Sequence, residues 1–243
     1  MSSEILFYVL LIIVAFLYAS VGHGGASGYL ALMALYSFAP STMRPTALML
    51  NIIVSCIAFI QYYRSGYFQW KLFWPFAIAS VPAAFIGGLI TIDGELYKKI
   101  LGITLLFPVV KLAGFKFQSK VVIKELNILV ALFIGIIIGF ISGLIGIGGG
   151  IILSPLILLL HWADMKKTAA VSALFIFVNS LAGFIGLLSK EFSLETQMGL
   201  MIVLVLVGGI LGSYFGARKF DHLVLKKLLA LVLVIASVKL ILT

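Results

Sequence analysis

Hydrophobic residues fill this chain in long runs, and charged or glycine residues separate one run from the next. Eight of the ten runs cover 17 to 21 residues, close to the length that an α-helix needs to cross the hydrocarbon core of a bilayer, about 30 Å. We therefore predict an all-α polytopic membrane protein. The ten predicted segments cover residues 5–21, 28–39, 46–62, 71–91, 96–113, 127–145, 150–161, 168–188, 196–215 and 223–242.

Two of the segments are too short to cross a membrane alone. Residues 28–40 and 150–162 hold 13 residues each and directly follow a glycine-rich run, so as helices they reach only about 20 Å. A glycine break inside a membrane helix frees backbone N–H and C=O groups, which is tolerated only where protein buries the break or where it lines a wet cavity. We expect both glycine turns to lie part-way across the bilayer and to approach each other from opposite sides.

The two halves of the chain repeat each other. The glycines that begin at Gly22 recur from Gly146, 124 positions later, and Gly88 falls on Gly212 at the same offset. Each half holds five segments, an odd number, so the second half starts on the opposite side of the membrane and the two repeats are inverted. The predicted units are a first transmembrane repeat (1–114), a cytoplasmic connecting loop (115–126) and a second transmembrane repeat (127–243).

Composition and charge agree with a membrane protein. Hydrophobic residues make up 63% of the chain and charged residues 10%, whereas soluble domains carry roughly 25% charged residues. The net charge of +9 comes from Lys and Arg at segment ends, which form no basic face and so argue against a nucleic-acid partner. If every segment changes sides, 12 of the 17 Lys and Arg collect on one face. The positive-inside rule makes this face cytoplasmic and places both termini outside.

The glycine turns predict an anion site built from the backbone. Glycine adopts positive φ easily, which lets successive N–H groups converge, and a short helix that starts at the turn adds unpaired N–H donors and the positive end of its dipole. The alternatives are close helix packing for the glycines and interhelical hydrogen bonding for the Ser and Asn side chains. The candidate substrate-binding residues are Gly22, His23, Gly24, Gly25, Ser27, Asn51, Gly146, Gly148, Gly149, Gly150, Ser154, Ser172 and Asn179.

A few ionisable residues bear on the chemistry. His23 either titrates and so couples transport to protons, or is a neutral ring bonded to a backbone carbonyl. No carboxylate lies in the middle of a predicted segment, which weakens readings as a cation transporter. Arg44 either attracts anions near the first short segment or extends to the membrane surface as a topology residue. Cys56 is alone and no metal-ligand cluster occurs, so we expect neither a metal nor a cofactor.

One motif resembles a known family. The run from Gly146 to Pro155 is similar to the G-x-G-G-G-x-x-x-x-P signature of the sulfite exporter TauE/SafE family of membrane anion transporters. The resemblance covers essentially the whole chain and implies transport of small sulfur-containing or organic anions, such as sulfite, sulfoacetate or related sulfonates, across a bacterial inner membrane. The first half departs from the signature, because Ala26 replaces the third glycine and Ala31 stands in place of the proline.

The predicted function is secondary transport of such anions by alternating access, with the substrate held between the two glycine turns. The alternatives are a passive anion channel and a membrane-embedded enzyme; for the enzyme the one candidate nucleophile is Ser142, and His161 and His222 lie at segment ends. As partners we expect a small anion, the lipid bilayer and no nucleic acid. Assembly with further copies of the chain is left open.

Overall fold

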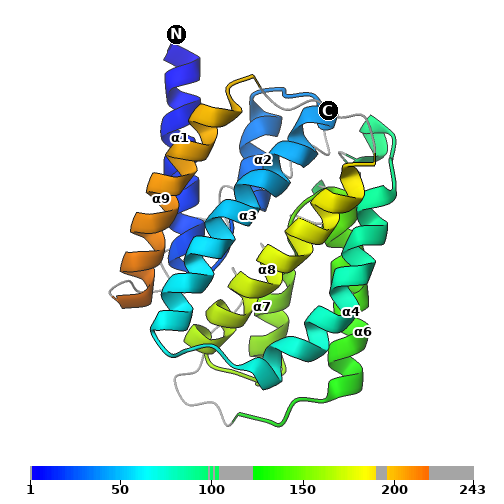
Figure 1. Cartoon of the computed structure of the whole chain (residues 1–243). Coiled ribbons are helices and arrows are strands. Elements are labelled where there is room, and N and C mark those ends of the chain that lie inside the picture. The colour runs from blue at the N-terminus through cyan, green and yellow to red at the C-terminus, as the bar shows by residue number, and fades with distance from the viewer. Residues whose placement is uncertain (1, 98, 101, 104–122, 190–195, 219–243) are drawn as a thin grey trace.

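A computed structural model describes the chain except for residues 1, 98, 101, 104–122, 190–195 and 219–243 (Figure 1). Within the described ranges the chain forms helices and no strand, which confirms the all-α prediction. Segment 223–242 and most of segment 96–113 lie outside the described residues. The helices are α1 (Ser2–Ser20), α2 (Ala26–Leu35), α3 (Pro40–Arg64), α4 (Trp70–Leu89), α6 (Ile128–Ile145), α7 (Gly150–Leu159), α8 (Met165–Leu187) and α9 (Met198–Arg218).

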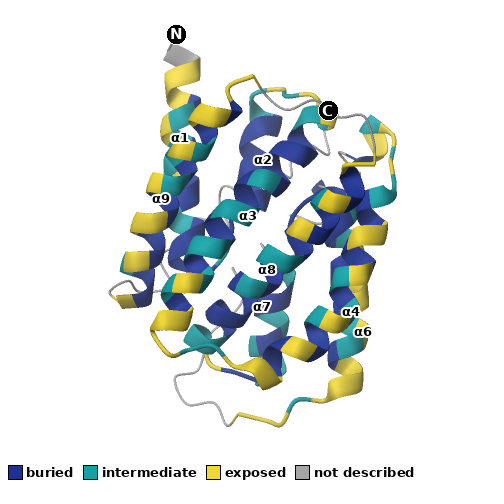
Figure 2. Cartoon of the chain, in the orientation of Figure 1, coloured by how far each residue is buried: buried dark blue, intermediate teal, exposed yellow. Residues whose placement is uncertain are grey.

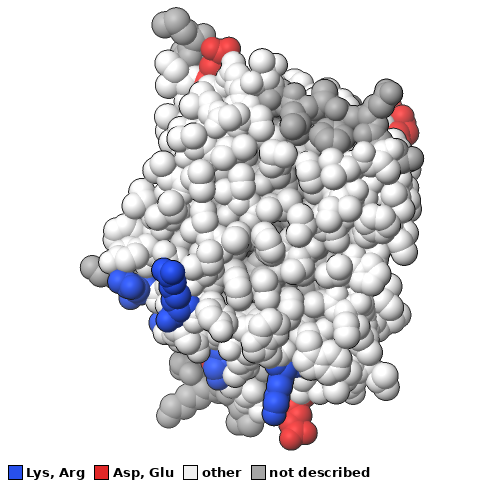
Figure 3. Space-filling model, viewed as in Figure 1, with Lys and Arg blue, Asp and Glu red and all other residues white. Residues whose placement is uncertain are grey.

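Helix lengths divide the fold into spanning and short elements. The helices α3, α4, α6, α8 and α9 are long and apolar enough to cross a bilayer. In contrast, α2 and α7 hold 10 residues each, or about 15 Å, which confirms that they cannot span a bilayer alone. The middle of the face in Figure 3 carries no charged side chain, and Leu129 and Phe133 on α6 are 77% and 65% exposed. Apolar side chains this exposed are suited to lipid contact.

Two long helices form the centre of the molecule. Helices α3 and α8 pack against each other, between an α1–α9 pair on one side and an α4–α6 pair on the other (Figure 1). The outer helices carry most of the exposed positions in Figure 2. Small residues let each pair approach closely, as expected for packing glycines: a Cβ on Gly139 or Gly143 would meet the α4 backbone, and one on Gly212 or Gly216 would meet the α1 backbone.

The two short helices begin and end at matching positions. Both bounds of α7 lie 124 positions after those of α2, the offset at which the glycines recur. Ser37 and His161, also 124 apart, follow the two helices with φ of 61° and 59°. The next residue in each case, Phe38 or Trp162, donates its N–H to the carbonyl five residues earlier at 3.0 Å, which is the Schellman way of ending a helix.

The corresponding long helices run in opposite directions. In Figure 1, α1 and α3 run downward from their N-terminal ends, whereas their counterparts α6 and α8 run upward. This arrangement agrees with an inverted repeat, which stays a prediction, as do the domain bounds.

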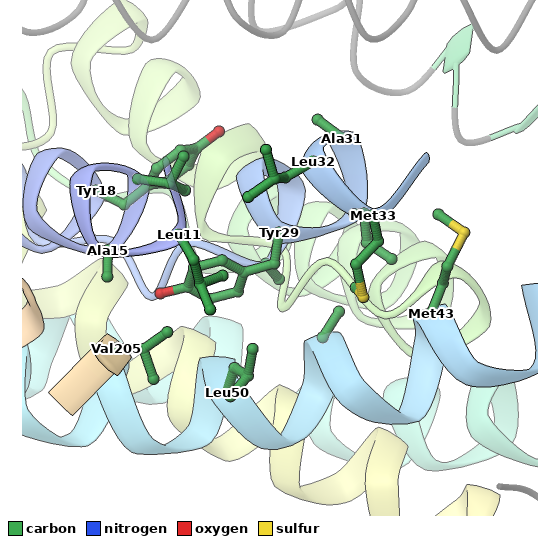
Figure 4. Packing of buried hydrophobic residues seen from close by; sticks show 14 of the residues in the cluster. Leu11, Ala15, Tyr18, Tyr29, Ala31, Leu32, Met33, Met43, Leu50 and Val205 are labelled. Carbon is green, nitrogen blue, oxygen red and sulfur yellow. The ribbon is translucent and has the colours of Figure 1, made fainter. Parts of the chain in front are cut away.

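Helix α2 lies inside the protein along nearly its whole length. Every residue from Ala26 to Ala34 is buried. Figure 4 shows Tyr29 and Leu32 of α2 packed with Tyr18 of α1 and Leu50 of α3. A helix with no polar face is suited to this position, because burying its apolar surface on all sides favours folding. The close packing also fixes the place where α2 starts, directly after the first glycine turn.

Candidate anion site at the glycine turns

The first turn connects α1 to α2 through backbone conformations that favour glycine. Gly22 and Gly25 have φ of 76° and 101°, in the left-handed region where a side chain is strained. The Tyr29 hydroxyl donates to the Gly24 carbonyl at 3.0 Å, and its ring fills the space that a side chain on Gly25 would need. The turn is therefore held from within α2 itself.

The second turn connects α6 to α7 in a similar way. Gly146, Gly148 and Gly149 have φ of 89°, 71° and 76°. The Gly146 N–H donates to the Ser142 carbonyl at 2.8 Å and closes α6. Beyond the turn, the Ile152 N–H donates to the Gly149 carbonyl at 3.1 Å and opens the hydrogen-bond ladder of α7.

The two turns meet at one side chain, Asn51 of α3, which is 1% exposed. Its Oδ1 accepts the N–H of Ala26, the first residue of α2, at 3.1 Å. Its Nδ2 donates to the Ser180 hydroxyl of α8 at 2.7 Å. A Cβ added to either Gly24 or Gly148 would collide with the Asn51 amide. The amide of Asn51 therefore touches both glycine turns, one from each half of the chain.

A second polar connection joins the halves through His23. The half-buried ring has Nδ1 3.0 Å from the Val21 carbonyl and Nε2 3.0 Å from the Ser154 hydroxyl. A carbonyl only accepts, so Nδ1 carries the proton that points at Val21. The Ser154 hydroxyl of α7 is also hydrogen-bonded to the Ser172 hydroxyl of α8, at 2.7 Å. The first turn is thus linked by hydrogen bonds to both helices that follow the second turn.

Two other candidate substrate-binding residues, Ser27 and Asn179, form hydrogen bonds that do not connect the two glycine turns. The Ser27 hydroxyl donates to the hydroxyl of Tyr18 on α1 at 2.9 Å. The Asn179 Nδ2 donates to the carbonyl of Phe175 in its own helix at 2.8 Å, and among the described residues its Oδ1 has no partner. These contacts are the interhelical and intrahelical hydrogen bonds that polar residues of membrane helices commonly make.

Arg44 lies inside the protein and does not extend to the membrane surface. The side chain is 7% exposed. The bonds run from Nη1 to the carbonyl of Ile90, at 2.9 Å, and from Nη2 to the carbonyls of Gly87 (2.9 Å), Gly88 (2.9 Å) and Gly143 (2.8 Å). A cation at the end of α4 donates to carbonyls around its last turn and lies at the negative end of the helix dipole. The topology role considered for Arg44 from the sequence is therefore wrong.

Sequence reasoning did not place Ser142 in the binding site. Ser142 lies in the last turn of α6 with an exposed fraction of 0%, and its hydroxyl has no hydrogen-bond partner among the described residues. A Cβ built on Gly149 would lie 3.4 Å from the Ser142 Cβ, so the serine borders the second turn. The sequence feature that could have identified Ser142 is its position four residues before Gly146, which is about one helical turn from the glycine turn.

A pocket lies at a different place, away from the glycine turns. This cavity of about 240 Å³ lies where α1 and α9 begin, and it is lined by Glu4, Phe7, Tyr8, Tyr36, Phe38, Gln197 and Met201. None of the candidate substrate-binding residues lines it. No group of three His, Cys, Asp or Glu side chains that could hold a metal occurs in the described part of the chain.

Comparison with known proteins identifies the family. A family profile described as sulfite exporter TauE/SafE matches residues 7–240. The chain belongs to this family. The resemblance drawn from the glycine motif is therefore confirmed, and the chain is a multi-pass membrane transporter of the TauE/SafE, sulfite exporter type.

Two relatives are also named as transporters. A probable membrane transporter protein of Sinorhizobium fredii is 34% identical over 232 residues, which cover 94% of each chain. Another from Methanocaldococcus jannaschii is 28% identical over 149 residues, covering 60% of this chain and 55% of the relative. No solved structure matches this TauE/SafE protein. The names of the family and of these relatives indicate a transporter rather than an enzyme.

Proposed function

We propose that this TauE/SafE protein carries small sulfur-containing or organic anions, of the sulfite and sulfonate kind, across the bacterial inner membrane. The observation that carries the proposal is the meeting of two glycine turns at Asn51. Each turn opens a buried or half-buried helix of 10 residues, which offers N–H groups and a positive dipole end without a charged side chain. Such a site suits an anion and gives a cation no acidic partner.

The proposed mechanism is alternating access. The Asn51–Ser180 bond and the His23–Ser154 bond both join one half of the chain to the other. Rocking of one half against the other would stretch these bonds and expose the space between the turns to one side of the membrane at a time. Both chain termini lie outside the cytoplasm in this proposal.

The close packing of the turns supports a carrier over a passive channel. A Cβ on any of Gly24, Gly148 or Gly150 would collide with a neighbouring side chain, so the turns lie against other groups and not beside an open pore. In liposomes containing the protein, a carrier shows saturable uptake and exchange of labelled for unlabelled anion. Uptake that rises linearly with anion concentration and shows no exchange would favour the channel.

The proposal is tested by measuring anion flux in a variant that carries side chains at the glycines of the second turn. We expect the double variant Gly148→Ala, Gly149→Ala to lose at least tenfold of sulfite or sulfoacetate flux in proteoliposomes, because both positions have positive φ and no room for a side chain. Gly199→Ala is the matched control, since nothing lies within 4 Å of a Cβ there. Wild-type flux in a double variant that stays monodisperse and reconstitutes normally would contradict the proposal.

A further inference from the structure

The two glycine turns differ in what occupies their helix starts. At the first turn, the Ala26 N–H at the start of α2 already donates to the Asn51 Oδ1. At the second turn, the Gly150 and Ile151 N–H groups at the start of α7 have no side-chain or backbone acceptor among the described residues. The first N–H of α2 therefore has an acceptor, whereas the first N–H of α7 has none among the described residues.

A third donor lies beside the free helix start. The buried hydroxyl of Ser142 has no hydrogen-bond partner in the described part of the chain, and Ser142 borders Gly149, the residue that precedes α7. A buried hydroxyl without a partner destabilises a fold. An anion bound at the start of α7 would accept this hydroxyl proton together with the free N–H groups, so the same group gains its partner when substrate arrives.

We propose that the anion binds at the second turn, where the Ser142 hydroxyl and the opening amides of α7 donate to its oxygens, and that Ser142 is a substrate-binding residue. At the first turn the Asn51 amide already accepts the first N–H of α2, and this helix contributes its positive end from nearby. This inference rests on the proposed anion transport. It replaces a site shared equally by two turns with a site at the second turn, because the first N–H of α7 has no acceptor among the described residues whereas that of α2 does.

Matched serine variants test the inference. Ser80 of α4 is also 0% exposed and also has a hydroxyl without a partner among the described residues, but it packs against Gly139 in the α4–α6 interface. Sulfite and sulfoacetate are titrated separately into the purified full-length protein by calorimetry. We expect Ser142→Ala to weaken anion binding about tenfold or more, since a hydrogen bond to a charged group is lost, and Ser80→Ala to change it less than twofold.

Thermal stability separates a binding role from a structural one. Removing a partnerless buried hydroxyl should leave the Tm of ligand-free Ser142→Ala equal to or above that of the wild type, and the anion should raise the Tm of the variant less than that of the wild type. Unchanged anion affinity in Ser142→Ala would overturn the inference, and so would an affinity loss that comes with a lower ligand-free Tm. If the wild type binds neither anion, the proposed function fails and the inference fails with it.

Discussion

Asn51 joins three parts of the molecule through one amide group. Its oxygen bonds the first N–H of α2, its nitrogen bonds Ser180 of α8, and both turns pack against it. An amide suits this place because it accepts and donates at once. A single residue on α3 therefore satisfies one helix start and connects the two halves of the chain.

Replacing Asn51 by an acid tests the electrostatics of the site. Asn51→Asp keeps the side-chain shape and adds a negative charge next to Gly148. We expect at least tenfold weaker binding of sulfite, because like charges in a site poor in water repel strongly. Calorimetry on the purified protein measures the affinity for sulfite. Asn179→Asp, measured in the same assay, shows how a buried acid elsewhere on the central helices changes this affinity. Equal binding by wild type and Asn51→Asp would contradict an anion at the second turn.

Arg44 shows how a buried charge is accommodated without an acid. Its guanidinium donates to carbonyls of α4 and α6. We expect Arg44→Gln to lower the free energy of unfolding by about 2–4 kcal/mol, because several helix-end carbonyls lose their donor. Arg64→Gln, at an exposed position, should change it by less than about 0.5 kcal/mol. Denaturation in detergent measures both, and equal midpoints for the two variants would mean that the Arg44 bonds add no stability.

At the scale of elements, glycines set the distance between paired helices. A Cβ on Gly216 of α9 would meet the backbone of Ser20 on α1. Gly216→Ala should therefore push the two helices apart and lower the free energy of unfolding by about 1–3 kcal/mol. Gly199→Ala on the same helix has open space and should be neutral. A stable Gly216→Ala protein would show that the α1–α9 pair adapts to an extra methyl group.

The sequence predicts most elements, and its errors have identifiable causes. The expected segment 46–62 starts six residues too late, because α3 begins at Pro40, where the missing N–H of proline costs nothing in the first helical turn. The helix then continues through Pro45. Both glycine turns and both short helices were expected, since glycine runs and segment length are local signals.

The contacts of the site could not be predicted in the same way. That Asn51 reaches both turns, that Arg44 points at the end of α4 and that Ser142 borders Gly149 depend on how α3, α6 and α8 pack. Helix packing is set by many small surface contacts across the chain, and a single sequence gives their pattern but not their register. The sequence therefore names polar residues near the turns without saying which of them meet.

At the scale of the whole molecule, orientation is open to direct test. In a Cys56→Ala background, we expect Glu4→Cys at the start of α1 to react with a membrane-impermeant maleimide added outside cells. Ser65→Cys, in the exposed connection after α3, should react only after permeabilisation. These outcomes follow from the excess of Lys and Arg on the predicted cytoplasmic face. The reverse labelling pattern would place both termini in the cytoplasm.

The pairing of α1 with α9 has a consequence for biosynthesis. The ribosome delivers the first helix to the bilayer long before its partner has been translated, so the glycine-lined contact surface of that pair cannot form until nearly all of the polypeptide has been made. Until α9 has been translated, the nascent α1 helix is in contact with lipid or with the insertion machinery. Chains truncated before α9 should consequently be recognised as incomplete and degraded by quality-control proteases.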